Sequence, residues 1–281
     1  MFRAMTQADP TTPPKLTDRA QLLQNRARAR DEGMFLQQLA ADQVQDRLSE
    51  VNRTFTNPAV VTGFPHVWQT VFPAAKIIAD EETLDLDPGV HDLVIHGLCL
   101  HWANDPVGQI IQAKRALKPD GLFIGVLFGG QTLAELRAVL SEVEIEITGG
   151  LSPRILPMGE IRDLGALLQR AGFALPVADS DLREVSYRSV ASLLGDLRLM
   201  GERNALEQRL SKPLTRNFLT MLEDRYSLHF PTDDNRIKAS FDLVFLTGWA
   251  PDDSQPKPLR PGSAAARLAD ALGTDENNLS D

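Results

Sequence analysis

Small, acidic and aromatic residues suited to ligand binding follow the short apolar runs of this sequence. Glycines let the backbone approach a ligand, carboxylates accept hydrogen bonds from hydroxyl and amino groups, and aromatic rings stack on flat bases. Short apolar runs bounded by Gly and Pro predict buried strands, and the ligands of parallel sheets bind beyond the carboxyl ends of the strands. We therefore expect one ligand site at that edge. The candidate binding residues are Gly63, Phe64, Asp80, Glu81, Gly97, Leu98, His101 and Trp102.

Three further residues are candidates to face a substrate, and each has a structural alternative. Gly129 and Gly130 follow an apolar run, where they either admit a ligand to the backbone or simply form a turn. Arg154 could bind a carboxylate through its planar guanidinium, but a helix end or an ion pair would engage it equally well. The alternative for His101 and Trp102 is an aromatic edge that packs beneath another element.

The sequence identifies no catalytic residue and predicts no metal site. Its five histidines lack ligand spacing with acids or thiolates. Its single cysteine, Cys99, lies in an apolar run, which predicts a buried small residue rather than a nucleophile. A lone cysteine also excludes an internal disulfide and is typical of a reducing compartment. No general base can be named.

Residues 91–130 predict the core of the fold. Apolar runs at 92–96 and 122–128 predict two buried strands, and the spacing of apolar residues over 107–117 predicts a helix between them. A turn is predicted at Lys118-Pro119-Asp120-Gly121. A strand, a crossover helix and a second strand without alternation form a right-handed unit of a parallel sheet covered on both faces. The fold class is therefore α/β.

The rest of the chain is predicted to add helices around this core. A disordered segment, 1–15, precedes a helical cap, 16–56, whose two helices break near 31–33. Residues 57–250 form the α/β domain, with a helical insertion at about 188–230 that forms a lid, and 251–281 form a flexible tail. The other predicted elements are strands at 57–63, 75–79, 182–187 and 241–249, and helices at 66–72, 131–148, 158–171, 190–208 and 214–226.

Composition excludes several classes of function. With 281 residues, of which 43% are hydrophobic, the chain can bury one large core, and one main domain is expected. The formal net charge of -9 disfavours a nucleic-acid partner, and the arginines from Arg19 to Arg30 are interpreted as a solvated helix face. No apolar run approaches the length of a membrane span, and the first residues lack the apolar region of a signal peptide. We expect no membrane span and a cytoplasmic location.

The motifs of the core resemble a known family. A strand ending in LHW, the LKPDG turn and the apolar strand after it resemble the fourth and fifth strands of class I S-adenosylmethionine-dependent methyltransferases. The longer motifs LFGGQTLAELR, GGLSPR and LLGDLRLMGERNAL are similar to the methyltransferase-like complex I assembly factors, which are mitochondrial arginine hydroxylases, and more distantly to the malonyl-carrier-protein methyltransferase BioC. The resemblance implies a Rossmann-like, mostly parallel sheet and S-adenosylmethionine as the cofactor. It also implies a protein substrate, such as a subunit of a respiratory complex.

One segment departs from the family pattern. An acid should end the first strand and three glycines should follow at alternate positions, yet Val61 replaces the acid, and Pro65 and Val67 replace the second and third glycines. Proline has no N–H to donate, and valine cannot accept a hydrogen bond from the cofactor's ammonium group. The interval from Gly63 to Asp80 holds one helix and one strand where the family has two of each. This predicts a sheet one strand short of seven, without the acid that holds the ribose, and leaves Asp80 and Glu81 as candidates to meet the adenine.

These departures leave three functions open. The first is a working methyltransferase, the second is an arginine-hydroxylase-like modifier of a respiratory subunit, and the third is a non-catalytic assembly or binding protein with a degenerate cofactor site. The altered loop predicts that S-adenosylmethionine binds weakly or not at all.

Overall fold

The computed structural model describes residues 15–210 and 212–256. The chain divides into two compact units, Met1–Pro251 and Asp252–Asp281, and all helices and strands of the described residues lie in the first. Apart from Lys15, the predicted disordered segment 1–15 lies outside the described residues, and so does the predicted tail beyond residue 256.

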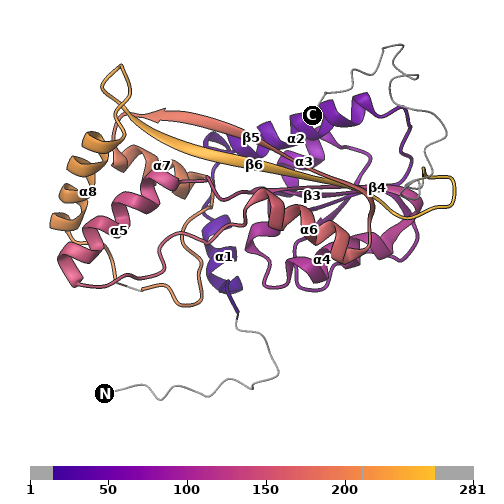
Figure 1. Ribbon diagram of the computed structural model, residues 1–281, viewed down its shortest axis with the longest axis horizontal. Coiled ribbons are helices and arrows are strands. Elements are labelled where there is room, and N and C mark those ends of the chain that lie inside the picture. Colours follow the sequence, from indigo (N-terminus) through magenta and orange to yellow (C-terminus); the bar gives the residue numbers. More distant parts are fainter. Residues whose placement is uncertain (1–14, 211, 257–281) are drawn as a thin grey trace, which may run out of the picture. The chain divides into compact units, whose positions relative to one another are not determined.

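A six-stranded sheet forms the centre of the first unit (Figure 1). The strand order is β2-β1-β3-β4-β6-β5. The first four of these are parallel, and β6 runs antiparallel to both β4 and β5. The described residues thus have the predicted class I methyltransferase-like, Rossmann-like fold, with six strands in place of seven. The strands are β1 (Pro58–Thr62), β2 (Lys76–Ala79), β3 (His91–Gly97), β4 (Leu117–Phe128), β5 (Ala174–Tyr187) and β6 (Ile237–Trp249).

Side chains on the two faces of the sheet pack into two separate apolar clusters. Successive residues of a strand point to opposite faces, so Val60 packs in one cluster and Val61 in the other. Helices α2 (Phe35–Glu50) and α3 (Pro65–Val71) cover the first face, and α4 (Pro106–Ala116) and α6 (Ile161–Ala171) cover the second (Figure 1). Burial on both faces explains why residues 93–95 and 122–128 of the central strands are apolar without alternation.

Three helices pack around the far ends of the two antiparallel strands. They are α5 (Ala134–Thr148), α7 (Val190–Leu199) and α8 (Arg216–His229), and they gather where β5 and β6 extend beyond the rest of the sheet (Figure 1). Tyr226 of α8 is fully buried there, and its hydroxyl donates to the Lys238 carbonyl of β6 at 2.9 Å. Helices α7 and α8 supply the insertion predicted at 188–230, which we call the lid.

The N-terminal helix is attached to the segment that follows α7. Helix α1 (Arg19–Arg26) begins at Asp18, whose side chain accepts a hydrogen bond from the Gln21 N–H. Thr17 forms an isolated bridge with Leu206, and the Asp18 N–H donates to the Ala205 carbonyl at 2.8 Å. A short 3-10 helix, η1 (Asp31–Gly33), separates α1 from α2, in agreement with the predicted break near 31–33.

Three predicted elements need correction. The predicted turn Lys118-Pro119-Asp120-Gly121 is part of β4, where it forms an irregularity between the pairs His91–Leu117 and Leu93–Leu122. The helix predicted at 190–208 ends at Leu199, because the chain turns at Gly201 with a φ of 78° that other residues rarely adopt. Strand β5 begins eight residues earlier than the predicted strand at 182–187 (182 − 174 = 8), since β6 pairs along its whole length.

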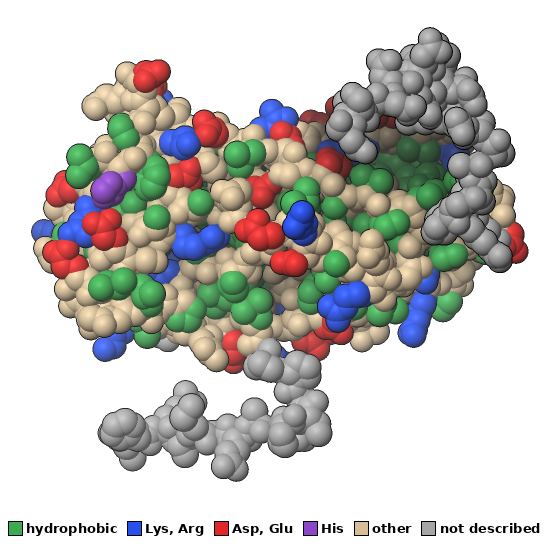
Figure 2. Space-filling model, in the orientation of Figure 1, with side chains coloured by type: hydrophobic (Ala, Val, Ile, Leu, Met, Phe, Trp, Pro, Cys, Tyr) green, Lys and Arg blue, Asp and Glu red, His purple; other side chains and the backbone are tan. Residues whose placement is uncertain are grey.

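The surface mixes charges of both signs. On the face shown in Figure 2, acidic and basic side chains of the described residues are interspersed, with no continuous basic surface. Within the described part of the chain, no helix combines the length and the apolar character that crossing a bilayer requires.

Trp68 of α3 gives a test of the core. Its side chain is fully buried, stacks on Phe72 with ring centroids 6.2 Å apart, and donates from Nε1 to Gln37 Oε1 at 2.9 Å. We expect Trp68→Ala to lower the free energy of unfolding by about 3–5 kcal/mol, because it removes these contacts and leaves a cavity. Urea denaturation measures the change. Leu228→Ala, at a side chain that is 74% exposed, is the control and should change it by less than about 0.5 kcal/mol.

Candidate functional site

The parallel strands bring several predicted binding residues to one edge. Thr62, the last residue of β1, pairs with both Ala79 at the end of β2 and Gly97 at the end of β3. Gly63, Asp80 and Gly97 therefore lie side by side at the carboxyl edge of the sheet. This is the arrangement that the apolar runs predicted, since strands in register end together.

An ion pair with α1 covers this edge. Arg26 Nη1 donates to Asp80 Oδ1 at 2.7 Å, and Arg19 lies 3.3 Å from the same carboxylate. The Arg26 and Asp80 side chains are only 6% and 5% exposed. Burial by itself raises the pKa of Asp80, but the two guanidinium groups outweigh it and leave that pKa below its usual value. The prediction of a solvated arginine face is therefore wrong for Arg26.

Protein side chains fill the space beside two of the candidate glycines. A Cβ atom built on Gly63 would collide with the Arg26 guanidinium, and one built on Gly97 would collide with the Trp68 indole. The Arg26 guanidinium also lies over the Phe64 ring, 5.7 Å from its centroid. Instead of leaving the backbone open to a ligand, both glycines make room for these two side chains.

The position of β2 bears on the prediction about the ribose acid. In dinucleotide-binding sheets the second strand lies next to the first, and an acid about 20 residues after the glycine loop binds the ribose hydroxyls. Strand β2 pairs directly with β1, and Asp80 follows it at once. In this strand order the missing strand would lie beyond β2, so Asp80 becomes the candidate for the acid that binds the ribose. Glu81 is exposed, and only its backbone carbonyl is engaged, by the Gln109 amide at 2.9 Å.

A buried acid that the sequence analysis missed lies beside the predicted aromatic pair. His101 and Trp102 belong to the 3-10 helix η2 (Leu100–Trp102). Trp102 Nε1 donates to Glu202 Oε2 at 2.6 Å, and His101 Nε2 lies 3.4 Å from the same oxygen. The other carboxylate oxygen of Glu202 and Nδ1 of His101 are buried without a hydrogen-bond partner. Glu202 belongs to the motif LLGDLRLMGERNAL, which resembles the family. That resemblance was the only feature of the sequence that pointed to Glu202.

Behind the edge, a histidine and the cysteine form a neutral buried pair. His96 Nε2 lies 2.8 Å from Gln109 Oε1, and Cys99 Sγ lies 3.3 Å from His96 Nδ1. Burial lowers the pKa of His96 to about 4 and raises that of the Cys99 thiol well above its usual value. Cys99 is therefore a buried thiol, as predicted, and His96 is uncharged at neutral pH. Leu98 is also buried, and its carbonyl accepts from Gln37 at 3.4 Å.

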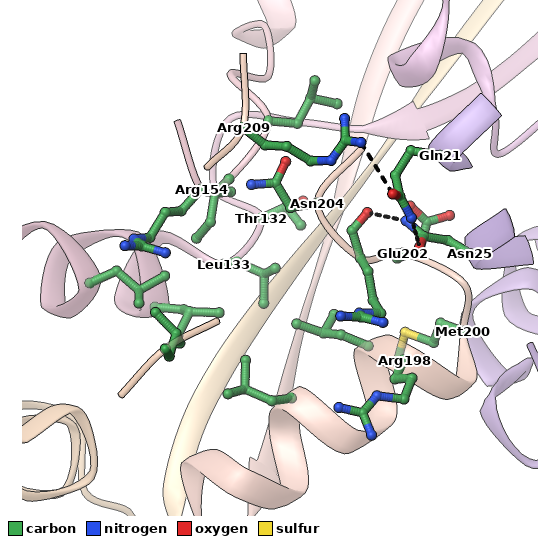
Figure 3. Close-up of a pocket in the computed structure, with 18 of the residues that line it drawn as sticks. Gln21, Asn25, Thr132, Leu133, Arg154, Arg198, Met200, Glu202, Asn204 and Arg209 are labelled. Carbon is green, nitrogen blue, oxygen red and sulfur yellow. Dashed lines mark hydrogen bonds between the residues drawn. The ribbon is translucent and has the colours of Figure 1, made fainter. Parts of the chain in front are cut away.

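A cavity of about 710 Å³ lies between α1, α5, α7 and the loop after α7. Trp102 and Glu202 line it, whereas Gly63, Asp80 and Gly97 do not. Figure 3 shows Arg154, Arg198 and Arg209 placed in three directions around Leu133. Trp102 is thus placed toward the lid rather than toward the glycine loop.

The three predicted substrate-facing residues differ in their placement. Arg154 forms an ion pair with Glu144 at 2.6 Å and lies over the Phe218 ring, which agrees with its structural alternative. It also lines the cavity, and its contact with a substrate stays a prediction. Gly129 and Gly130 are not among the cavity residues. Asp242 and Glu160 respectively occupy the space beside them. In the described part of the chain, no three His, Cys, Asp or Glu side chains gather in a way that could hold a metal ion.

Comparison with known proteins identifies the family. The methyltransferase domain family matches residues 32–125. A putative methyltransferase of Rickettsia prowazekii is 30% identical over 189 residues, which cover 65% of this chain and 80% of that protein. The chain belongs to the methyltransferase family. Membership indicates S-adenosylmethionine as the cofactor and supports the prediction of a methyltransferase.

Two further relatives match the predicted resemblance. The mitochondrial arginine-hydroxylase NDUFAF5 of Danio rerio is 39% identical over 198 residues, covering 70% of this chain and 61% of that protein. The malonyl-[acyl-carrier protein] O-methyltransferase of Xylella fastidiosa is 29% identical over 215 residues, covering 76% of this chain and 66% of that protein. This chain thus spans about three fifths of the length of the arginine hydroxylase. The names of the arginine-hydroxylase relatives place them in mitochondria, so the predicted cytoplasmic location is wrong.

The residues at the carboxyl edge do not fit the cofactor in the arrangement described here. Asp80 stands where an acid meets a ribose, but Arg26 neutralises it and fills the space beside Gly63. Two buried nitrogens of Arg26, Nε and Nη2, have no hydrogen-bond partner. The cofactor and the Arg26 guanidinium therefore compete for the same space.

Removing the Arg26 side chain should open the cofactor site. We expect wild-type protein to bind S-adenosylmethionine weakly, and Arg26→Ala to bind it about tenfold more tightly or better. The change clears the space beside Gly63 and frees Asp80 for a hydrogen bond that involves a charge, worth about 1.5–3 kcal/mol. Isothermal titration calorimetry measures both affinities, and Arg28→Ala, at an exposed residue of the same segment, is the control. Low-micromolar binding by wild type, or equal binding by Arg26→Ala, would show that Arg26 does not block the site.

Burial of His96 should make stability depend on pH. Its pKa falls from an ordinary 6.5 to about 4 on folding, so below about pH 6.5 the unfolded chain binds a proton that the folded chain does not. His96 makes its full contribution to the free energy of unfolding above pH 6.5. This contribution is lost as the pH falls toward 4, a change on the order of 3 kcal/mol. Urea denaturation over this range should show a smaller loss for His96→Gln than for wild type. If the free energy of unfolding fell equally with pH in the two proteins, the pH dependence could not be assigned to His96.

Proposed function

We propose that this protein acts as a methyltransferase-family modifier of a protein substrate during the assembly of respiratory complex I. The observation that carries the proposal is the cavity of about 710 Å³, which reaches from the lid to Trp102 next to the carboxyl edge of the sheet. A volume of this size suits one ligand or a few residues of a peptide. The similarity to the arginine hydroxylase, 39% identical over 198 residues, supports the choice of substrate and process.

Glu202 is the residue best placed to take part in such a reaction. It is the one carboxylate among the residues that line the cavity, and its free oxygen is buried beside the Trp102 indole. A buried carboxylate within reach of a bound substrate can accept a proton from an attacking group. The indole N–H fixes the orientation of this carboxylate, and methyl transfer otherwise requires mainly positioning of the two reactants.

A non-catalytic assembly protein is the second candidate, and Arg26 favours it. A family member whose cofactor space is filled by its own ion pair could retain the substrate cavity and serve only to hold the partner. An arginine-hydroxylase-like modifier is the third candidate, and it would act on an arginine and add an oxygen atom from molecular oxygen instead of a methyl group.

Mass spectrometry of candidate complex I subunits separates these functions. The protein is incubated with each subunit and S-adenosylmethionine, and the products are digested and sequenced. We expect one peptide to gain the mass of a methyl group, slowly because Arg26 occupies the space beside Gly63, and Glu202→Gln, which keeps the shape of the side chain, to slow this gain further by about 10²–10⁴-fold. Gain of a single oxygen atom would assign the hydroxylase activity. Stable complex formation without any mass change would assign the binding function.

A further inference from the structure

The cavity under the lid carries a strong excess of positive charge. Among the residues that the structure describes, five basic residues line it and Glu202 is the only acidic one, although the whole chain has a net charge of -9. The basic residues are Arg154, Arg198, Arg203, Arg209 and Lys212. A concentration of positive charge in a protein whose net charge is negative favours a negatively charged ligand at that place.

Three of these cations are available to a ligand. Arg154 pairs with Glu144, and Arg209 pairs with Asp18. Within the described residues, no ion pair engages Arg198, Arg203 or Lys212, whose side chains are exposed at the cavity. Partial burial and the positive charges of Arg198 and Arg28 lower the pKa of Arg203. An anion between these side chains would relieve their mutual repulsion.

The single acid does not cancel this charge. Glu202 accepts a short hydrogen bond from Trp102 and lies close enough to Arg26 for their charges to interact. Trp102 therefore engages one oxygen of Glu202 from the side of the sheet, and this one negative charge stands against five positive charges. Apart from four uncharged polar residues, the rest of the lining is apolar and includes Leu133, Leu136, Leu140 and Phe241.

From this lining we infer that the substrate segment presented to the cavity is acidic: a carboxylate side chain flanked by apolar residues. The carboxylate binds between Arg198, Arg203 and Lys212, and the apolar neighbours pack on the leucines of α5 and α7. An arginine in the same place would meet three unpaired cations. The inference rests on the proposed function, because it assigns the chemistry of the protein segment that this cavity receives.

Three capped peptides test the charge preference without cofactor or turnover. Each has the core Leu-Leu-Xaa-Leu-Leu between Gly-Ser ends, with acetylated and amidated termini, so that only Xaa carries charge. Calorimetric titration into the full-length protein should give the tightest binding for Xaa = Glu, about tenfold weaker binding for Gln, and no measurable binding for Arg. Added salt should weaken binding of the Glu peptide more than that of the Gln peptide.

A double variant ties the preference to the named residues. We expect Arg198→Gln combined with Arg203→Gln to weaken binding of the Glu peptide about tenfold and to leave binding of the Gln peptide nearly unchanged. Arg170→Gln, at an exposed arginine of α6 outside the cavity, is the matched control and should bind as wild type does. Both substitutions are at exposed side chains and should leave the fold intact, which circular dichroism verifies.

Failure of this inference is distinct from failure of the proposed function. Equal binding of the Glu and Gln peptides, preference for Arg, or an unchanged affinity in the double variant would each overturn the acidic-segment inference, even if a subunit is still modified. Selective Glu binding without any modification of a subunit would uphold the inference and overturn the catalytic part of the function.

Discussion

The buried ion pair between Arg26 and Asp80 connects the first helix to the sheet edge, and the arrangement of the candidate site depends on it. It joins a helix at the start of the chain to the carboxyl edge of the sheet, where both side chains are almost completely removed from water. Charges buried in this way are tolerated only when paired, because an isolated charge loses its hydration without compensation. Helix α1 is therefore held over the edge, and through Thr17 and Asp18 it also holds the segment after α7. The lid and the sheet edge are joined through one short helix.

This arrangement explains why the glycine loop could change. The usual loop donates backbone N–H groups to an anionic or polar ligand. Here a guanidinium supplies the positive charge at the same place, and the glycine that remains gives it room. Proline at position 65 is then harmless, because as the first residue of α3 it needs no N–H for the helix. The altered loop is thus consistent with an edge that holds a side chain of the protein itself in the place of a ligand.

The sequence was sufficient to predict the features that depend on the local pattern of apolar and turn residues, such as strand ends and the number of strands. Gly63, Asp80 and Gly97 were found because they follow apolar runs, and strands in register must end together. The six-stranded sheet followed from counting residues between Gly63 and Asp80. The contacts that give the site its character could not be found in this way: Arg26 and Asp80 are 54 residues apart, and Trp102 and Glu202 are 100 residues apart. Periodicity placed Arg26 on a helix but could not show which face of that helix would be buried.

The position of Cys99 has a kinetic consequence. The only thiol of the chain lies behind the carboxyl edge, 3.6 Å from the Val61 carbonyl and almost completely inaccessible. A thiol reagent can reach it only when the structure around it opens, and the rate of labelling then reports the frequency of that opening. Cys99 is close enough to Asp80 and Arg26 for their charges to act on its thiol, so the labelling rate reports how often the structure around this ion pair opens.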